Sequence, residues 1–228
     1  TILDYSVEGK EEEAVFEATC SEILRTIEKA KGNSKIPFCV FKPTGIASMT
    51  LLTKISAKEQ LNKEQHEELT ATRNRMNRIC KAAHDNDVRL FIDAEETWTQ
   101  DAIDALVREM MLKYNKEKAI VFNTAQLYRH DRVEFIKRCY FDAQTNNYFL
   151  GFKLVRGAYM EKERERAKEM GYNSPIYPNK KATDKGYDDA VRFCVEHIDR
   201  IAICAGTHNE SSSEMLVKLM EEKNIAKN

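Results

Sequence analysis

Short apolar runs rich in β-branched and aromatic residues alternate along this chain with longer segments of helical periodicity. The runs predict strands at residues 2–7, 38–42, 88–93, 119–123, 149–155 and 201–206. The longer segments predict helices at about residues 11–31, 49–55, 63–84, 99–114, 131–146, 160–170, 183–197 and 211–223. Repeats of a strand followed by a helix are typical of a parallel sheet with crossover helices, so we expect an α/β protein.

No linker rich in Gly, Ser or Pro divides the chain, and residues 171–181, with Pro175 and Pro178, predict a loop. We therefore expect one domain over residues 1–228. An open doubly wound sheet and a (β/α)8 TIM-type barrel both fit the repeats. The barrel is favoured because no Gly-x-Gly-x-x-Gly motif follows the first strand, although a closed barrel needs eight strands and six are predicted.

Charge and cysteine usage exclude several classes of protein. The net charge is -1, and acidic and basic residues are interleaved, so no basic face indicates nucleic acid as a partner. The six cysteines form no Cys-x-x-Cys pair, which is typical of core residues in a reducing compartment. No apolar run approaches the roughly 20 residues that span a bilayer, and no signal-peptide pattern opens the chain. We expect a soluble or peripheral intracellular protein.

Polar residues follow almost every predicted strand. They are Lys42 to Gly45, Asp93 to Glu96, Asn123 to Gln126, Lys153 to Tyr159 and Thr207 to Glu210. Because the carboxyl ends of parallel strands meet at one rim, where barrel enzymes place catalysis, we expect these side chains to form the site.

Three cations belong to this predicted rim: Lys42, Lys153 and Arg156. They suit a phosphate-bearing cofactor and a carboxylate substrate. A metal site on Asp93, Glu95 and His208 is an alternative, but the same cations would repel a divalent ion, so we expect none. Lys42 could simply extend its ammonium group to solvent, and Glu96 suits the start of the next helix. Asp93 facing Lys42 would form a buried ion pair, which indicates function more than stability.

Four motifs lie at the predicted strand ends: Lys-Leu-Val-Arg-Gly-Ala-Tyr at 153–159, Ile-Asp-Ala-Glu-Glu at 92–96, Phe-Asn-Thr-Ala-Gln at 122–126 and Thr-His-Asn at 207–209. Together they resemble the proline dehydrogenase family. They occur in the family's order across nearly the whole chain, from Leu3-Asp4-Tyr5 onward. The resemblance implies a distorted (β/α)8 barrel with non-covalent FAD. It also implies oxidation of L-proline to Δ1-pyrroline-5-carboxylate, with electrons passed to a membrane quinone.

The resemblance also implies a role for individual residues. Lys42 would pair with the proline carboxylate, and Asp93 would fix the position of the Lys42 side chain. Tyr159 would pack against the proline ring. Lys153 would complete the catalytic set with Lys42 and Asp93, because a cation near the isoalloxazine favours the anionic reduced flavin. The residues that would bind the cofactor are Asn123, Lys153, Arg156, Gly157, Ala158, Thr207 and His208. Gly157 would let the backbone approach the cofactor without a Cβ in the way.

The sequence departs from the family's pattern in two places. Ala125 stands where the family usually has a tyrosine, which removes an aromatic wall. The family's last two strands and its final helix, which carries a paired arginine motif, have no counterpart before Asn228. We therefore expect an incomplete barrel, with the sequence a fragment of a longer protein.

Two other functions remain open beside proline dehydrogenase. A hydroxyproline dehydrogenase resembles it closely, and a non-catalytic barrel fragment could act in assembly through its open edge. For an enzyme of this family we expect peripheral association with a bacterial inner membrane, from the cytoplasm, or with the mitochondrial inner membrane, from the matrix.

Overall fold

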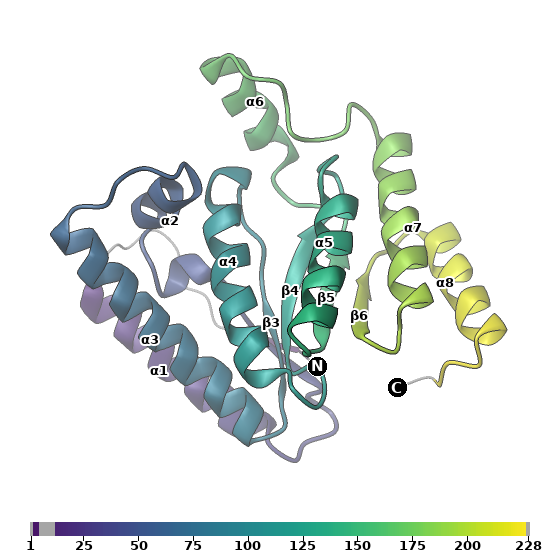
Figure 1. Ribbon diagram of the computed structural model, residues 1–228, viewed down its shortest axis with the longest axis horizontal. Coiled ribbons are helices and arrows are strands. Elements are labelled where there is room, and N and C mark those ends of the chain that lie inside the picture. The colour runs from purple at the N-terminus through teal and green to yellow at the C-terminus, as the bar shows by residue number, and fades with distance from the viewer. Residues whose placement is uncertain (1, 5–11, 227–228) are drawn as a thin grey trace. The chain divides into compact units, whose positions relative to one another are not determined.

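The computed structural model of the protein describes residues 2–4 and 12–226 (Figure 1). The chain forms two compact units, Thr1–Asn123 and Thr124–Asn228. The division falls inside strand β4 (Val121–Gln126) and not in a linker. The expectation of one domain stays a prediction, and each unit is described by itself.

The first unit is built on parallel strands that neighbour one another in sequence order. Its strands are β1 (Ile2–Asp4), β2 (Phe38–Phe41), β3 (Arg89–Ile92) and the first residues of β4. Its helices are α1 (Glu13–Ala30), α2 (Met49–Ser56), α3 (Lys63–Asp85) and α4 (Thr97–Tyr114), with a 3-10 turn, η1, at Pro43–Gly45. Helix α1 packs on α3 and α2 packs on α4 (Figure 1). Aromatic side chains join the strands, since the rings of Phe38 and Phe91 stack with centroids 4.1 Å apart.

The second unit contains the end of β4 and two further parallel strands, β5 (Leu150–Val155) and β6 (Ile201–Gly206). Its helices are α5 (Arg132–Thr145), α6 (Met160–Met170), α7 (Lys180–Glu196) and α8 (Glu210–Glu222). Helix α7 packs against both α5 and α8 (Figure 1). Both units therefore have the repeated strand-then-helix order that the hydrophobic pattern predicts.

Two predicted boundaries differ from the structure by three residues. Strand β4 continues to Gln126 instead of ending at Asn123, because the polar side chains at its end are buried and bonded inside the protein. Helix α7 begins at Lys180, three residues early, because Asn179 caps it by accepting a hydrogen bond from the N–H of Ala182 (3.0 Å). The end of the first predicted strand, residues 5–7, lies outside the described residues.

The six cysteines are free thiols, and Cys20, Cys39, Cys80 and Cys194 are buried, which confirms them as core residues. Cys139 and Cys204 are half-buried. In the described ranges, no helix is long and apolar enough to cross a membrane.

Candidate active site

In the first unit, Lys42 and Asp93 follow neighbouring strands. Lys42 precedes the 3-10 turn directly after β2, and Asp93 follows β3. The N–H of Asp93 donates to the carbonyl of Phe41 at 3.0 Å, which fixes the backbones of the two residues side by side. Both side chains are half-buried. The structure thus brings the two predicted residues to the same strand ends, and their ion pair stays a prediction.

Glu95 joins the segment after β3 to the turn after β2. Its Oε1 accepts the N–H of Thr44 at 2.9 Å, and its Oε2 accepts the Thr44 hydroxyl at 2.6 Å. Burial raises the pKa of Glu95 to about 7, against the hydrogen bonds from Thr44 and the charge of Lys42, while nearby Glu96 adds to the rise. Glu96 is the N-cap residue of α4, at the start of that helix as predicted, although its side chain makes no capping hydrogen bond.

Asn123 lies inside β4, and its side chain faces a polar partner on α4. Its Nδ2 donates to Oδ1 of Asp104 at 2.8 Å, and Nε2 of Gln100 donates to the same oxygen at 2.9 Å. Ala125 is almost fully buried in the same strand. The polar residues that predicted the end of this strand therefore lie inside it.

In the second unit, Lys153 lies near the carboxyl end of β5. It is half-buried and pairs in register with Cys204 of β6. Burial raises the pKa of the Cys204 thiol, and the charge of Lys153 opposes that rise. A lysine ammonium at this position provides a localised positive charge on a strand, which is a rigid support.

The turn of Arg156, Gly157 and Ala158 is tied to the end of β4. The N–H of Tyr128 donates to the carbonyl of Arg156 at 2.6 Å, and the N–H of Ala158 donates to Oε1 of Gln126 at 3.1 Å. Gly157 has φ +137°, and a Cβ there would lie 2.6 Å from the Tyr128 ring. The glycine is therefore required by a protein side chain as well as by its backbone conformation. Gly157 and Ala158 are exposed, so their backbone is accessible to a ligand.

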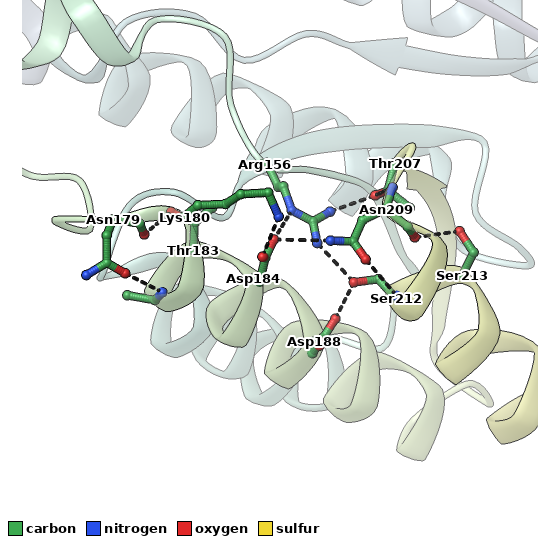
Figure 2. Close-up of polar contacts among 11 residues, drawn as sticks. Arg156, Asn179, Lys180, Thr183, Asp184, Asp188, Thr207, Asn209, Ser212 and Ser213 are labelled. Carbon is green, nitrogen blue, oxygen red and sulfur yellow. Dashed lines mark hydrogen bonds and ion pairs between the residues drawn. The ribbon is translucent and has the colours of Figure 1, made fainter.

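The Arg156 guanidinium donates to three side chains of its own unit (Figure 2). Its Nε bonds to Oδ1 of Asp184 and its Nη1 to Oγ1 of Thr207, both at 2.6 Å, and its Nη2 bonds to Oγ of Ser212 at 2.9 Å. The guanidinium also lies 4.4 Å from the ring centroid of Tyr187. Arg156 therefore links β5 with α7, the end of β6 and α8.

Asp184 completes this network on α7. Burial would raise the pKa of its carboxyl, but hydrogen bonds from Lys180 and Arg156 outweigh burial and hold it below the usual value. Because the pKa is lowered on folding, this carboxylate stabilises the fold above its ordinary pKa, and the contribution is lost as pH falls below it.

The network holds the loop that carries His208. The Thr207 hydroxyl accepts the N–H of Asn209 at 3.0 Å, and Oδ1 of Asn209 accepts the N–H of Ser212 at 3.1 Å, which caps α8 (Figure 2). His208 is exposed between these two fixed residues. Its backbone is thus restrained while its ring remains accessible to a ligand.

Tyr159 is the N-cap residue of α6, directly before the helix. It is half-buried, and its carbonyl accepts the N–H of Glu163 at 2.9 Å. The ammonium of Lys162 lies 5.6 Å from the centroid of its ring. The ring therefore lies at the start of a helix, next to the exposed turn at Gly157.

Three polar residues that bond to the candidate site residues were not predicted to belong to the site: Asp104, Asp184 and Ser212. Glu95 and Gln126 were expected at the strand ends, but their hydrogen bonds to Thr44 and to the N–H of Ala158 were not predicted. Asp104, Asp184 and Ser212 lie in helices with many polar residues, so nothing in their spacing distinguishes them. Among the described residues, no group of three or more His, Cys, Asp or Glu side chains could hold a metal ion.

The chain is similar to known proteins along its whole length. A family model described as proline dehydrogenase matches residues 1–228. The carbapenem antibiotics biosynthesis protein CarD of Pectobacterium carotovorum is 33% identical over 95% of this chain and 56% of its own length. Mitochondrial proline dehydrogenase 1 of Drosophila melanogaster is 41% identical over 67% of this chain and 24% of its own, and the human protein 38% over 69% and 27%. The chain thus spans about half of these relatives or less.

Solved structures share the fold at lower sequence identity. Proline utilization A from Bdellovibrio bacteriovorus superposes with a TM-score of 0.84 at 19% identity, covering 100% of this chain and 24% of that one. The Bradyrhizobium japonicum protein gives 0.83 at 20% identity, over 96% and 22%. The likeness confirms the expected α/β fold of a partial TIM-type barrel. With a family match from its first residue to its last, the chain belongs to the proline dehydrogenase family.

Proposed function

We propose that the chain takes part in the FAD-dependent oxidation of L-proline to Δ1-pyrroline-5-carboxylate. The observation that carries this proposal is the pair of half-buried lysines at strand ends, Lys42 after β2 and Lys153 on β5, in a chain of this family. One cation suits the substrate carboxylate and the other an electron-rich cofactor ring.

In this proposal three residues bind and orient the substrate. Lys42 binds the proline carboxylate, and Asp93 orders the lysine, because their backbones are joined at the strand ends. Tyr159 packs against the proline ring. A substrate that is held by both its carboxylate and its ring can move little within the site. Fixing the orientation of the substrate is the main contribution of the protein to hydride transfer.

Another set of residues binds the cofactor. The exposed backbone of Gly157 and Ala158, the half-buried Lys153 and the exposed His208 fit a large anionic ligand with a flat ring. FAD, when bound, would supply the hydride acceptor for the ring CH2 group next to the proline nitrogen. Lys153 stabilises negative charge on the ring, and Thr207 and His208 bind further along the cofactor. The turn that begins at Arg156 also binds the cofactor, and Asn123 is the last of the proposed cofactor-binding residues.

The experiment is anaerobic flavin reduction followed by visible absorption. The purified chain should carry a flavin band that bleaches on addition of L-proline. Lys42→Ala should raise the KM for proline roughly 10- to 100-fold, since a hydrogen bond to a charged group contributes about 1.5–3 kcal/mol. Lys29→Ala, which removes an exposed lysine of α1, is the matched control and should leave KM unchanged. An unchanged KM in Lys42→Ala would exclude this lysine as the substrate clamp.

The same assay distinguishes the two alternative functions. A hydroxyproline dehydrogenase would bleach faster with hydroxyproline than with proline. A barrel that acts only in assembly would show no flavin band and no effect of either amino acid.

We further propose a quinone as the electron acceptor, with peripheral attachment to a membrane. The Drosophila and human relatives are named as mitochondrial, which supports a mitochondrial location as one option. The membrane that we propose is the mitochondrial inner membrane or a bacterial inner membrane. Reoxidation of the reduced flavin by a soluble quinone analogue, followed by return of the absorption band, tests the acceptor.

A further inference from the structure

The turn that begins at Lys42 is held by side chains from two other parts of the first unit. At its centre, Thr44 donates both its N–H and its hydroxyl to Glu95. At its far end, the carbonyl of Ile46 accepts a hydrogen bond from Nε of Arg75, a fully buried residue of α3, at 2.9 Å. Within the turn, the N–H of Gly45 donates to the carbonyl of Lys42 at 3.0 Å. The backbone that follows Lys42 is therefore fixed along its length.

Glu95 is itself held firmly in place. The residue is 3% exposed, and its N–H donates to Oε1 of Gln100 on α4 at 3.0 Å. Burying a carboxyl group is costly unless its oxygens are hydrogen-bonded, and here Thr44 bonds to each of them. This arrangement uses a buried acid to hold one short turn.

We propose that Glu95 is a positioning residue for substrate binding, because through Thr44 it fixes the backbone that carries Lys42. The inference rests on the proposed function, in which Lys42 binds the carboxylate of the substrate. A lysine has a long, flexible side chain, so its ammonium is placed accurately only if its backbone is fixed. Glu95 acts through Thr44 and needs no contact with the substrate.

The first test compares Glu95→Ala with Glu95→Gln. Alanine removes both acceptors, so the KM for proline should rise about tenfold while kcat changes less than twofold. Glutamine keeps the shape: its Oε1 can accept the Thr44 N–H, and its Nε2 can donate to the Thr44 hydroxyl. Its KM should stay within threefold of the wild type. A glutamine variant as impaired as the alanine variant would overturn the proposal, because the charge of Glu95 near Lys42 would then be what matters.

Thr44→Val tests the same contact without emptying a buried position. It removes the hydroxyl donor and keeps the shape of the side chain, so KM should rise about fivefold. Thr53→Val, in the neighbouring helix α2, is the matched control and should not change KM. A KM for Thr44→Val equal to that of the control would contradict the role of this hydrogen bond.

Amide hydrogen exchange tests the turn independently of catalysis. The N–H of Thr44 should exchange at least tenfold faster in Glu95→Ala than in the wild type, and close to the wild-type rate in Glu95→Gln. If the wild type shows no reduction of flavin by proline, the proposed function fails, and exchange alone decides whether Glu95 holds the turn. Unchanged exchange in Glu95→Ala would refute the inference even in an active enzyme.

Discussion

Gly157 occupies a position that no other residue can take without strain. Its φ of +137° lies outside the range of ordinary side chains, and the missing Cβ leaves room for the ring of Tyr128. Two separate constraints, one of backbone and one of packing, therefore meet at one residue next to Arg156.

Gly157→Ala should lower the free energy of unfolding by about 3 kcal/mol, since backbone strain and overpacking each cost about 1–3 kcal/mol. Gly171→Ala is the matched control, because Gly171 also has positive φ (+71°) but nothing lies within 4 Å of its added Cβ. The control should lose about 1 kcal/mol, the conformational cost alone. Urea unfolding measures both. Equal losses would show that the contact with Tyr128 carries no energetic weight.

The sequence predicted a turn at Gly157 but assigned its bare backbone to the cofactor. The contact with Tyr128 could not be predicted, because it depends on how the end of β4 meets the turn after β5. Likewise Lys42 and Asp93 could be placed at strand ends from the apolar runs before them. The bonds of Glu95 to Thr44 could not, since hydrogen-bond partners distant in sequence leave no periodic signal.

At the scale of elements, Arg156 joins a strand to two helices. The N–H groups of its planar guanidinium donate to Asp184 on α7, to Ser212 on α8 and to Thr207 after β6 (Figure 2). A lysine could reach one of these acceptors but not three, because its donors share a single nitrogen. The arrangement of α7, α8 and the His208 loop therefore depends on the guanidinium.

Arg156→Lys should lower the free energy of unfolding by about 2 kcal/mol, because two of the three hydrogen bonds are lost and each contributes about 1 kcal/mol. Arg192→Lys, at an exposed position of α7, should change it by less than about 0.5 kcal/mol. Urea titration of the two variants makes the comparison. If both variants match the wild type, the network seen around Arg156 adds nothing to stability.

Strand and helix order followed from hydrophobic periodicity, whereas the extent of β4 did not. Its last residues include Asn123 and Gln126, which are polar and therefore predicted a strand end. Both are buried because Asp104 and the N–H of Ala158 provide hydrogen bonds inside the protein. Polarity marks a strand end only where such partners are missing.

At the scale of the whole molecule, each unit has a core that includes buried thiols. Burial raises the pKa of Cys80 in the first unit, and in the second it raises that of Cys194 to about 12. A thiol reacts as its thiolate and must be reached by the reagent, so both should be inert in the folded chain.

A maleimide reagent should therefore label Cys139 in the native chain, and Cys204 more slowly because burial raises its pKa. Cys20, Cys39, Cys80 and Cys194 should be labelled only after unfolding. Mass spectrometry of labelled peptides, with and without urea, gives the result for each cysteine separately. The urea concentration at which Cys80 and Cys194 become reactive reports the opening of each unit. Rapid labelling of either in native buffer would contradict the described cores.

The bond between Thr44 and Glu95 spans 51 residues of chain, and the bond between Arg156 and Thr207 spans another 51. On the ribosome, the segment with Lys42 must therefore wait for residue 95 to be synthesised before it can take its final form. The Arg156 side chain waits in the same way for residues 207 and 212. The hydrogen bonds around Lys42 and those of Arg156 therefore form late in the synthesis of their own units, after the first strands and helices of each unit have been made.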